Sequence, residues 1–239
     1  MNRLVIVVAS MAVVLIGAIA VPRTRPIAGN PVPLRHYAAT MLGATQYHLA
    51  VIGDSYTAGS AEGGEGPRGW TGQAWHALAQ RGVSIAADVA AEGGAGYTVR
   101  GNRGSLFVDL AGRSTHPDAA LVVFFGSRND HEADPAHVAG MARDAFERAR
   151  RVAPSAKMLV IGPPWPIAEV PENVLRIRDV LRAEAHAVGA EFVDPIVEHW
   201  FVDQPELIGA DGVHPNDVGH TYMADKIVPL IGSLLPIPA

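Results

Sequence analysis

The chain contains no cysteine among its 239 residues. Disulfides, a thiolate nucleophile and cysteine-ligated metals are therefore excluded. Basic residues are also scarce, since 19 Lys and Arg stand against 24 Asp and Glu, which gives a formal net charge of −5. Nucleic-acid binding needs clustered Lys and Arg that neutralise phosphates, so this balance argues against a nucleic-acid partner.

Charge is absent from one long segment near the N-terminus. Leu4–Val21 is apolar or small throughout, apart from Ser10 and Gly17. Ala18–Ala20 resembles a small-x-small cleavage site, and the run approaches the roughly 17–25 residues that cross a bilayer. Residues 1–21 are therefore interpreted as a signal peptide or an N-terminal membrane anchor. We expect the protein to be exported, and either secreted or membrane-anchored at the cell envelope.

Proline marks the next boundary. Residues 22–35 hold four prolines among Arg, Gly and Asn. Proline denies helices and sheets a backbone hydrogen bond, so this stretch is predicted to be an extended linker. The folded domain is then expected over residues 36–239, a length that suits one α/β domain.

Short apolar runs alternate with helical stretches beyond the linker. Such runs are typical of parallel strands buried on both faces, and they span Tyr47–Gly53, Ser84–Ala91, Ala119–Phe125, Met158–Ile161 and Glu191–Val193. Helices are predicted over Gly69–Arg81, Pro135–Val152, Pro171–Val188 and Pro215–Ile231, the last ended by Pro229 and Gly232. The alternation predicts a three-layer α/β/α fold: a flavodoxin-like parallel sheet of about five strands with helices on both faces. Ligands bind such folds beyond the carboxyl ends of the strands.

The first predicted strand ends in Gly53-Asp54-Ser55. A serine that directly follows a buried strand is well placed to be an exposed nucleophile. The same position also suits a helix N-cap or a turn serine. The segment is not the nucleophile elbow of α/β-hydrolases, because that motif needs glycine where Thr57 stands.

Two further strand ends carry candidate oxyanion donors. Asn129 follows the third strand, where its amide can point into the same cleft, although a turn or capping role suits it equally well. The second strand runs into a loop with Gly93, Gly94 and Gly96, which lets backbone N–H groups approach a ligand closely. The loop lacks the spacing of a phosphate-binding fingerprint.

Near the C-terminus an acid precedes a histidine by three residues, in Asp211-Gly212-Val213-His214. Asp211 can accept a hydrogen bond from one imidazole nitrogen of His214, which leaves the other nitrogen free to take a serine proton. A capped helix start with an incidental histidine is the alternative interpretation.

Taken together, these motifs resemble those of the SGNH (GDSL-like) hydrolase family, over roughly residues 47–233. The family's nucleophile block corresponds to the segment ending at Ser55, and its Asp-x-x-His block to Asp211 and His214. Its glycine donor is best matched by Gly96 and its asparagine donor by Asn129. There are two departures: Ala91 stands where family members often have asparagine, and Ser127 stands where they usually have glycine.

The resemblance implies a serine esterase with Ser55, His214 and Asp211 as the catalytic triad, and an acyl-enzyme intermediate. It implies an oxyanion hole built from Ser55, Gly96 and Asn129, with no metal and no organic cofactor. Acyl transfer to an alcohol by the same residues is an alternative. A non-catalytic, membrane-tethered binding module is a second, although the chain retains every residue that catalysis needs.

The substrate is less well defined by the sequence. Lipid, glycan and small-molecule esters are all compatible with the family. Four aromatic side chains in or after strand-end loops are predicted to line the substrate cleft: Tyr56, Trp70, Tyr97 and Trp165. A cluster of acids and histidines over residues 130–137 is interpreted as a solvated helix start, in preference to a metal site.

Overall fold

The computed structural model describes residues 46–235. By its internal contacts the chain divides into two units, Met1–Leu42 and Gly43–Ala239, and only the second contains described residues. The predicted signal peptide or anchor and the proline-rich linker lie outside the described residues. Within residues 46–235, no helix is both long and apolar enough to cross a membrane.

The centre of the domain is a five-stranded sheet with the order β2-β1-β3-β4-β5, and every neighbouring pair is parallel. The strands are β1 (Gln46–Gly53), β2 (Ser84–Ala91), β3 (Ala119–Phe125), β4 (Lys157–Ile161) and β5 (Glu191–Val193). This is the strand order of the flavodoxin-like doubly wound fold. The predicted fold class is confirmed.

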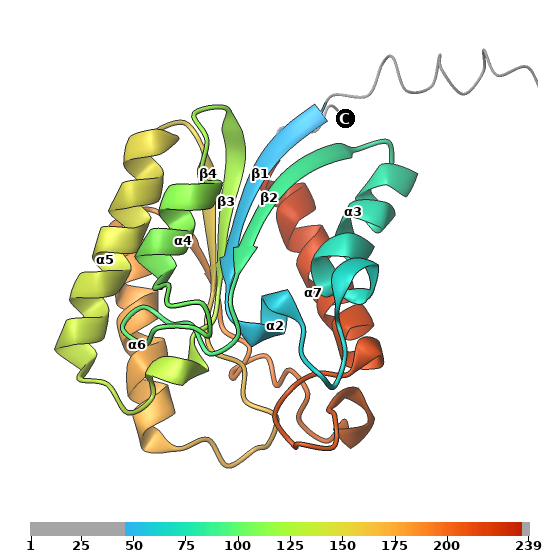
Figure 1. Ribbon diagram of the computed structural model, residues 1–239, viewed down its shortest axis with the longest axis vertical. Coiled ribbons are helices and arrows are strands. Elements are labelled where there is room, and N and C mark those ends of the chain that lie inside the picture. Colours follow the sequence, from blue (N-terminus) through green and yellow to red (C-terminus); the bar gives the residue numbers. More distant parts are fainter. Residues whose placement is uncertain (1–45, 236–239) are drawn as a thin grey trace, which may run out of the picture. The chain divides into compact units, whose positions relative to one another are not determined.

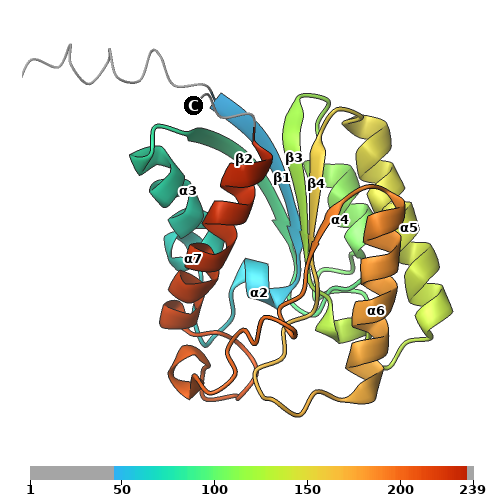
Figure 2. The ribbon, with the colours of Figure 1, turned by 180° about the vertical axis from the view of Figure 1, so that it is seen from behind.

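Helices cover both faces of the sheet. On one face lie α3 (Trp70–Gln80) and α7 (Asp217–Leu234), and on the other α4 (Phe107–Ser114), α5 (Pro135–Val152) and α6 (Glu172–Ala187), as the two views in Figure 1 and Figure 2 show. Side chains of β1 alternate between the two resulting cores. Leu49 and Val51 pack on the side of α3 and α7, whereas Ala50 and Ile52 pack on the side of α4 to α6. Each fully buried Val, Leu or Ile contributes roughly 1.5–3 kcal/mol of hydrophobic stabilisation.

The structure differs from the predicted helices at two places. The closing helix continues past Pro229 and Gly232 to Leu234. Proline removes one backbone hydrogen bond, but Val228 and Ile231 beside it are buried against the core and keep the chain helical. Helix α4 was not predicted, because it is short and begins after the apolar residue Leu106. The Asp109 carboxylate accepts a hydrogen bond from the Leu106 N–H at 3.0 Å and so caps its start.

The carboxyl ends of the parallel strands meet at one edge of the sheet. There β1 turns directly into the four-residue helix α2 (Ser55–Ala58), which lies at that edge in Figure 1. Glycine is required at the turn, because a Cβ atom on Gly53 would lie 2.3 Å from Thr57 Oγ1. The tight turn therefore presents Ser55 at the end of the sheet where ligands bind in this fold.

Candidate active site

Ser55 is the first residue of α2 and is half-buried. The side chain of Asp54 caps this short helix, because its Oδ1 accepts a hydrogen bond from the Tyr56 N–H at 2.9 Å. Among the described residues, no hydrogen bond uses the Ser55 N–H. That amide is therefore available at the helix start, next to its own hydroxyl.

The serine hydroxyl meets a histidine from the far end of the chain. Ser55 Oγ lies 3.0 Å from His214 Nε2, and the two residues are 159 positions apart in the sequence. On the other side of the ring, His214 Nδ1 lies 2.5 Å from Asp211 Oδ2. The structure thus brings together the three residues that the sequence motifs predicted, in the order hydroxyl, imidazole, carboxylate.

The Asp211 carboxylate is held in place by its own loop. Its second oxygen, Oδ1, accepts hydrogen bonds from the backbone N–H groups of Val213 at 2.8 Å and His214 at 2.9 Å. Partial burial works against ionisation of Asp211, but the hydrogen bonds from the His214 ring and from these two amides outweigh it and lower its pKa to about 2. The acid is therefore ionised at neutral pH, as a partner of an imidazolium must be.

Tyr56 connects the nucleophile to the histidine loop. Its hydroxyl donates a hydrogen bond to the Val213 carbonyl at 2.5 Å, and its fully buried ring packs edge-on against Phe125 and Phe201. The prediction that Tyr56 lines the substrate cleft is therefore wrong. The residue is part of the core, and its hydroxyl positions the loop that carries His214.

Of the three other aromatic residues predicted to line the cleft, two are buried in the core and one is partly exposed. Trp70 and Tyr97 are fully buried, so the prediction that they contact substrate is wrong for both. Trp70 Nε1 donates to Thr57 Oγ1 at 3.3 Å, and the Tyr97 ring packs against Phe107 with centroids 4.8 Å apart. Tyr97 follows the end of β2 and Trp70 begins α3, but both rings turn inward, where burial of a large ring stabilises the fold most. Only Trp165 is partly exposed.

Asp130 organises the glycine loop. Its carboxylate is fully buried and accepts hydrogen bonds from the N–H groups of Tyr97 at 2.8 Å and Thr98 at 2.8 Å, and from the hydroxyl of Ser127. A Cβ atom on Gly96 would lie 2.6 Å from Asp130 Oδ2, so only glycine allows this approach. The sequence placed Asp130 only in the cluster of acids and histidines over residues 130–137, and the clue to its role was its position directly after Asn129.

Both remaining oxyanion candidates already donate hydrogen bonds. Asn129 Nδ2 donates to the Ala95 carbonyl at 2.8 Å and to Asp54 Oδ2 at 3.4 Å, next to the nucleophile. The Gly96 N–H donates to the Val99 carbonyl at 2.8 Å. The oxyanion roles that the family resemblance implies for Asn129 and Gly96 therefore stay predictions, and an oxyanion bound by either residue would replace one of these hydrogen bonds.

Two buried titratable groups lie close to the triad. Burial raises the pKa of Asp54 to about 7, against the hydrogen bond from the Tyr56 amide and the positive charge of Arg128. His220 of α7 is also buried, and burial lowers its pKa to about 4. The Nδ1 atom of His220 accepts a hydrogen bond from the Trp70 N–H at 3.3 Å, so this histidine is a neutral structural residue. Sequence reasoning singled out neither.

The acids and histidines of residues 130–137 have several different partners, and among their side chains only those of His131 and Glu132 pair with each other, with Nε2 and Oε1 3.3 Å apart. Asp130 holds the glycine loop, and Asp134 caps α5 by accepting a hydrogen bond from the His137 N–H at 2.9 Å. Within residues 46–235, no group of three or more His, Asp or Glu side chains has an arrangement that could hold a metal ion.

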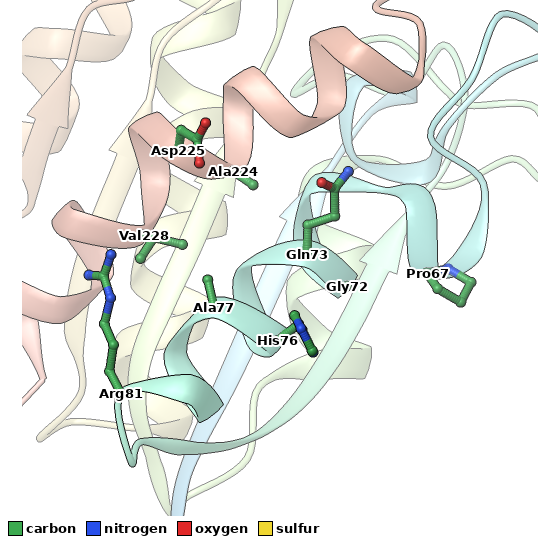
Figure 3. A pocket seen from close by; sticks show the side chains of 9 residues that line it. All are labelled: Pro67, Gly72, Gln73, His76, Ala77, Arg81, Ala224, Asp225 and Val228. Atoms are coloured by element: carbon green, nitrogen blue, oxygen red, sulfur yellow. The ribbon is translucent and has the colours of Figure 1, made fainter.

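Two cavities differ in their relation to the triad. One, of about 480 Å³, is lined by the segments Pro166–Glu169 and Asp203–Pro205 and by Phe201, Ile208 and Gly212, and so reaches the residue after Asp211. The other, of about 500 Å³, lies between α3 and α7, and its lining side chains are shown in Figure 3. Neither cavity is lined by a triad residue, but the first includes Gly212 of the loop between Asp211 and His214, which makes it the candidate substrate cavity of the two.

The fold, the hydroxyl–imidazole–carboxylate row and the strand-end loops define a hydrolase site of the serine type. The model of the GDSL-like lipase/acylhydrolase family matches residues 51–222. The GDSL lipase Rv0518 of Mycobacterium tuberculosis is 61% identical over 208 residues, which cover 86% of this chain and 90% of that protein. The chain belongs to the GDSL-like lipase/acylhydrolase family, as its motifs predicted, and is a carboxylic ester hydrolase.

Solved structures agree on the fold. The crystal structure of TesA matches with a TM-score of 0.64 at 24% identity, over 79% of this chain and 99% of that one. A family two carbohydrate esterase from Clostridium thermocellum, in complex with cellohexaose, matches with a TM-score of 0.61 at 17% identity, over 78% of this chain and 64% of that one. At these identities the likeness concerns the fold alone.

Proposed function

We propose that the protein hydrolyses carboxylic esters through an acyl-enzyme on Ser55, with His214 as general base and acid and Asp211 as the orienting carboxylate. The hydrogen-bonded row from Ser55 Oγ to His214 Nε2 and from His214 Nδ1 to Asp211 Oδ2 carries this proposal. Such a row lets the imidazole remove the serine proton while the carboxylate stabilises the imidazolium that forms.

The reaction proceeds in two halves. His214 takes the Ser55 proton as Oγ attacks the ester carbonyl, and the tetrahedral intermediate collapses when His214 protonates the departing alcohol. Water then attacks the acyl-enzyme, again with His214 as base, and releases the acid. The Ser55 N–H and the Asn129 amide are the groups proposed to hold the oxyanion, because both lie at the edge of the sheet beside the hydroxyl.

The substrate is proposed to be an ester with an apolar acyl chain. The cavity beside Gly212 supports this, because its lining includes Ile167, Phe201 and Ile208. Ile167 is 54% exposed, so its side chain is accessible to an acyl chain in this cavity. The Mycobacterium tuberculosis relative carries the name of a lipase, which points the same way.

The test is hydrolysis of p-nitrophenyl esters of increasing acyl length by the full chain, with Ser55→Ala as the control. Activity that rises from acetate to medium acyl chains and vanishes in the control supports the proposal. A fluorophosphonate probe should label the wild type at Ser55 and leave the control unlabelled. Unchanged hydrolysis by Ser55→Ala would overturn the serine mechanism.

We also propose that residues 1–21 direct the protein out of the cytoplasm. The uncharged run of Leu4–Val21 supports this proposal. Cell fractionation and mass spectrometry of the N-terminus test it. A chain that begins after Ala20 indicates cleavage, and an intact chain in the membrane fraction indicates an anchor. An intact chain in the cytoplasm would contradict export.

A further inference from the structure

Arg128 stands directly before Asn129, in a 3₁₀ helix that follows β3. Its side chain is half-buried, and the guanidinium carbon lies 4.4 Å from the ring centroid of Trp165. Stacking on an indole fixes the plane of a guanidinium and leaves its edge free for hydrogen bonds. The contact therefore holds a planar cation in a defined orientation next to a proposed oxyanion residue.

The charge of Arg128 has no counterion in the described part of the chain. No carboxylate there lies within 4.0 Å of its nitrogens, and its buried terminal nitrogen Nη1 has no hydrogen-bond partner. The other arginines near this edge differ, since Arg103 and Arg113 both pair with the buried Glu92. A buried, unsatisfied donor on a charged group is costly, so a partner for it is expected.

The positive charge of Arg128 acts on the active site itself. Burial raises the pKa of Asp54 to about 7 and that of Tyr56 to about 12, and in both cases the charge of Arg128 opposes the rise. These two residues flank Ser55 in the sequence. On its other side Arg128 contacts Trp165, whose neighbour Pro166 lines the cavity beside Gly212. Arg128 therefore lies near the residues that flank the nucleophile, and it contacts a residue next to the lining of the candidate substrate cavity.

We propose that Arg128, held over the Trp165 ring, binds an anionic group of the substrate, so that the enzyme prefers esters that carry a carboxylate or phosphate on the acyl or the alcohol side. This inference rests on the proposed function, and it makes Arg128 a specificity-determining residue. The planar guanidinium can donate two parallel N–H hydrogen bonds to two oxygens of one group, and both carboxylate and phosphate offer such a pair of oxygens. The substrate oxygens would then accept hydrogen bonds from the Nη1 group of Arg128, which has no partner within the described residues.

The experiment compares pairs of esters in which one member carries an added carboxylate, using the full chain. For the acyl side, the pair is p-nitrophenyl hexanoate and the mono-p-nitrophenyl ester of adipic acid. For the alcohol side, the pair is phenyl acetate and 4-acetoxybenzoate. The variants are Arg128→Met, which keeps an apolar stem on Trp165, and Arg128→Lys, which keeps the charge and loses the fork. Arg151→Met is the control, since Arg151 is an exposed residue at the end of α5.

We expect Arg128→Met to lower kcat/KM for the anionic member of at least one pair by about 10–100-fold, mainly through KM. The neutral member should change by less than about 3-fold, and Arg128→Lys should lie between Arg128→Met and the wild type. Free adipate and inorganic phosphate, added separately as inhibitors of neutral-ester hydrolysis, distinguish a carboxylate from a phosphate preference. Each should compete less well in Arg128→Met than in Arg151→Met.

A purely structural role for Arg128 predicts a different result. It would lower activity on the neutral and anionic members of each pair equally, and that outcome would overturn the inference. Normal hydrolysis of neutral esters, with no selectivity for anions that depends on Arg128, would also overturn it and leave the proposed function intact. A wild type that hydrolyses none of the four esters would overturn both.

Discussion

The Tyr56 hydroxyl donates a hydrogen bond to the Val213 carbonyl at 2.5 Å, which ties the residue after the nucleophile to the residue before His214. This hydrogen bond fixes the distance between the turn that carries Ser55 and the loop that carries His214, which are far apart in the sequence. The position of the imidazole relative to Ser55 depends on this bond as much as on the loop that carries it. A small error in such a position is costly in catalysis.

Tyr56→Phe is therefore expected to lower kcat about 10-fold with little change in KM, because the Val213 carbonyl loses its partner and the His214 loop is held less firmly. Steady-state kinetics on a p-nitrophenyl ester measures this. Tyr222→Phe is the matched control, since no hydrogen bond within residues 46–235 involves the Tyr222 hydroxyl. Equal kcat values for the two variants would show that the tether is dispensable.

Asn129→Ala is expected to lower kcat by about 10²–10³-fold if the amide stabilises the oxyanion, with KM changed far less. Asn173→Ala serves as the control, because Asn173 Nδ2 makes a surface hydrogen bond to Glu132 at 3.2 Å. The circular dichroism spectra of both variants should match the wild type. A loss of activity below 3-fold would remove Asn129 from the proposed site.

Gly96→Ala is expected to reduce both activity and stability. The added Cβ atom would lie 2.6 Å from a buried oxygen of Asp130, so the glycine loop would have to move. Gly93→Ala provides the comparison, because its Cβ atom would approach nothing closer than 3.6 Å, at the Asn102 side chain. Thermal unfolding and ester hydrolysis of the two variants should differ clearly. Similar melting temperatures for the two variants would show that the loop around Gly96 can move away from Asp130 at little cost in stability.

The raised pKa of Asp54 predicts a dependence of stability on pH. Burial lifts this pKa from 3.8 to about 7, so the folded state binds a proton more tightly than the unfolded state does. The resulting stabilisation is fully present below about pH 4 and is lost as the pH rises to about 7. Between pH 5 and 8 the free energy of unfolding of the wild type should therefore fall by roughly 2–3 kcal/mol more than that of Asp54→Asn.

Urea unfolding of both proteins at pH 5 and pH 8 measures this difference. The comparison with Asp54→Asn cancels the contribution of other groups that titrate in the same range, histidines above all. An equal change in the free energy of unfolding of both proteins between pH 5 and pH 8 would show that Asp54 is already ionised in the folded state at pH 5.

Much of the site could be read from short segments. Asp211 and His214 lie three positions apart in one loop, so their contact is local, and Ser55 follows directly from the end of a buried strand. The aromatic residues could not be placed in this way. Tyr56 and Tyr97 follow strand ends as a cleft residue would, but whether a ring turns inward depends on the helices packed against it, which come from distant parts of the chain.

The sequence by itself predicted the strands, the layers and the three residues of the hydrogen-bonded row, because short apolar runs mark buried strands and the family motifs mark Ser55, Asp211 and His214. Tertiary structure alone decided the contact of Arg128 with Trp165, the tether from Tyr56 to Val213 and the hydrogen bond of the Gly96 N–H to Val99. The first two join residues that are far apart in the sequence, and the third depends on how Asp130 folds the glycine loop. Such contacts arise only when packing selects one arrangement of loops whose local sequences allow several.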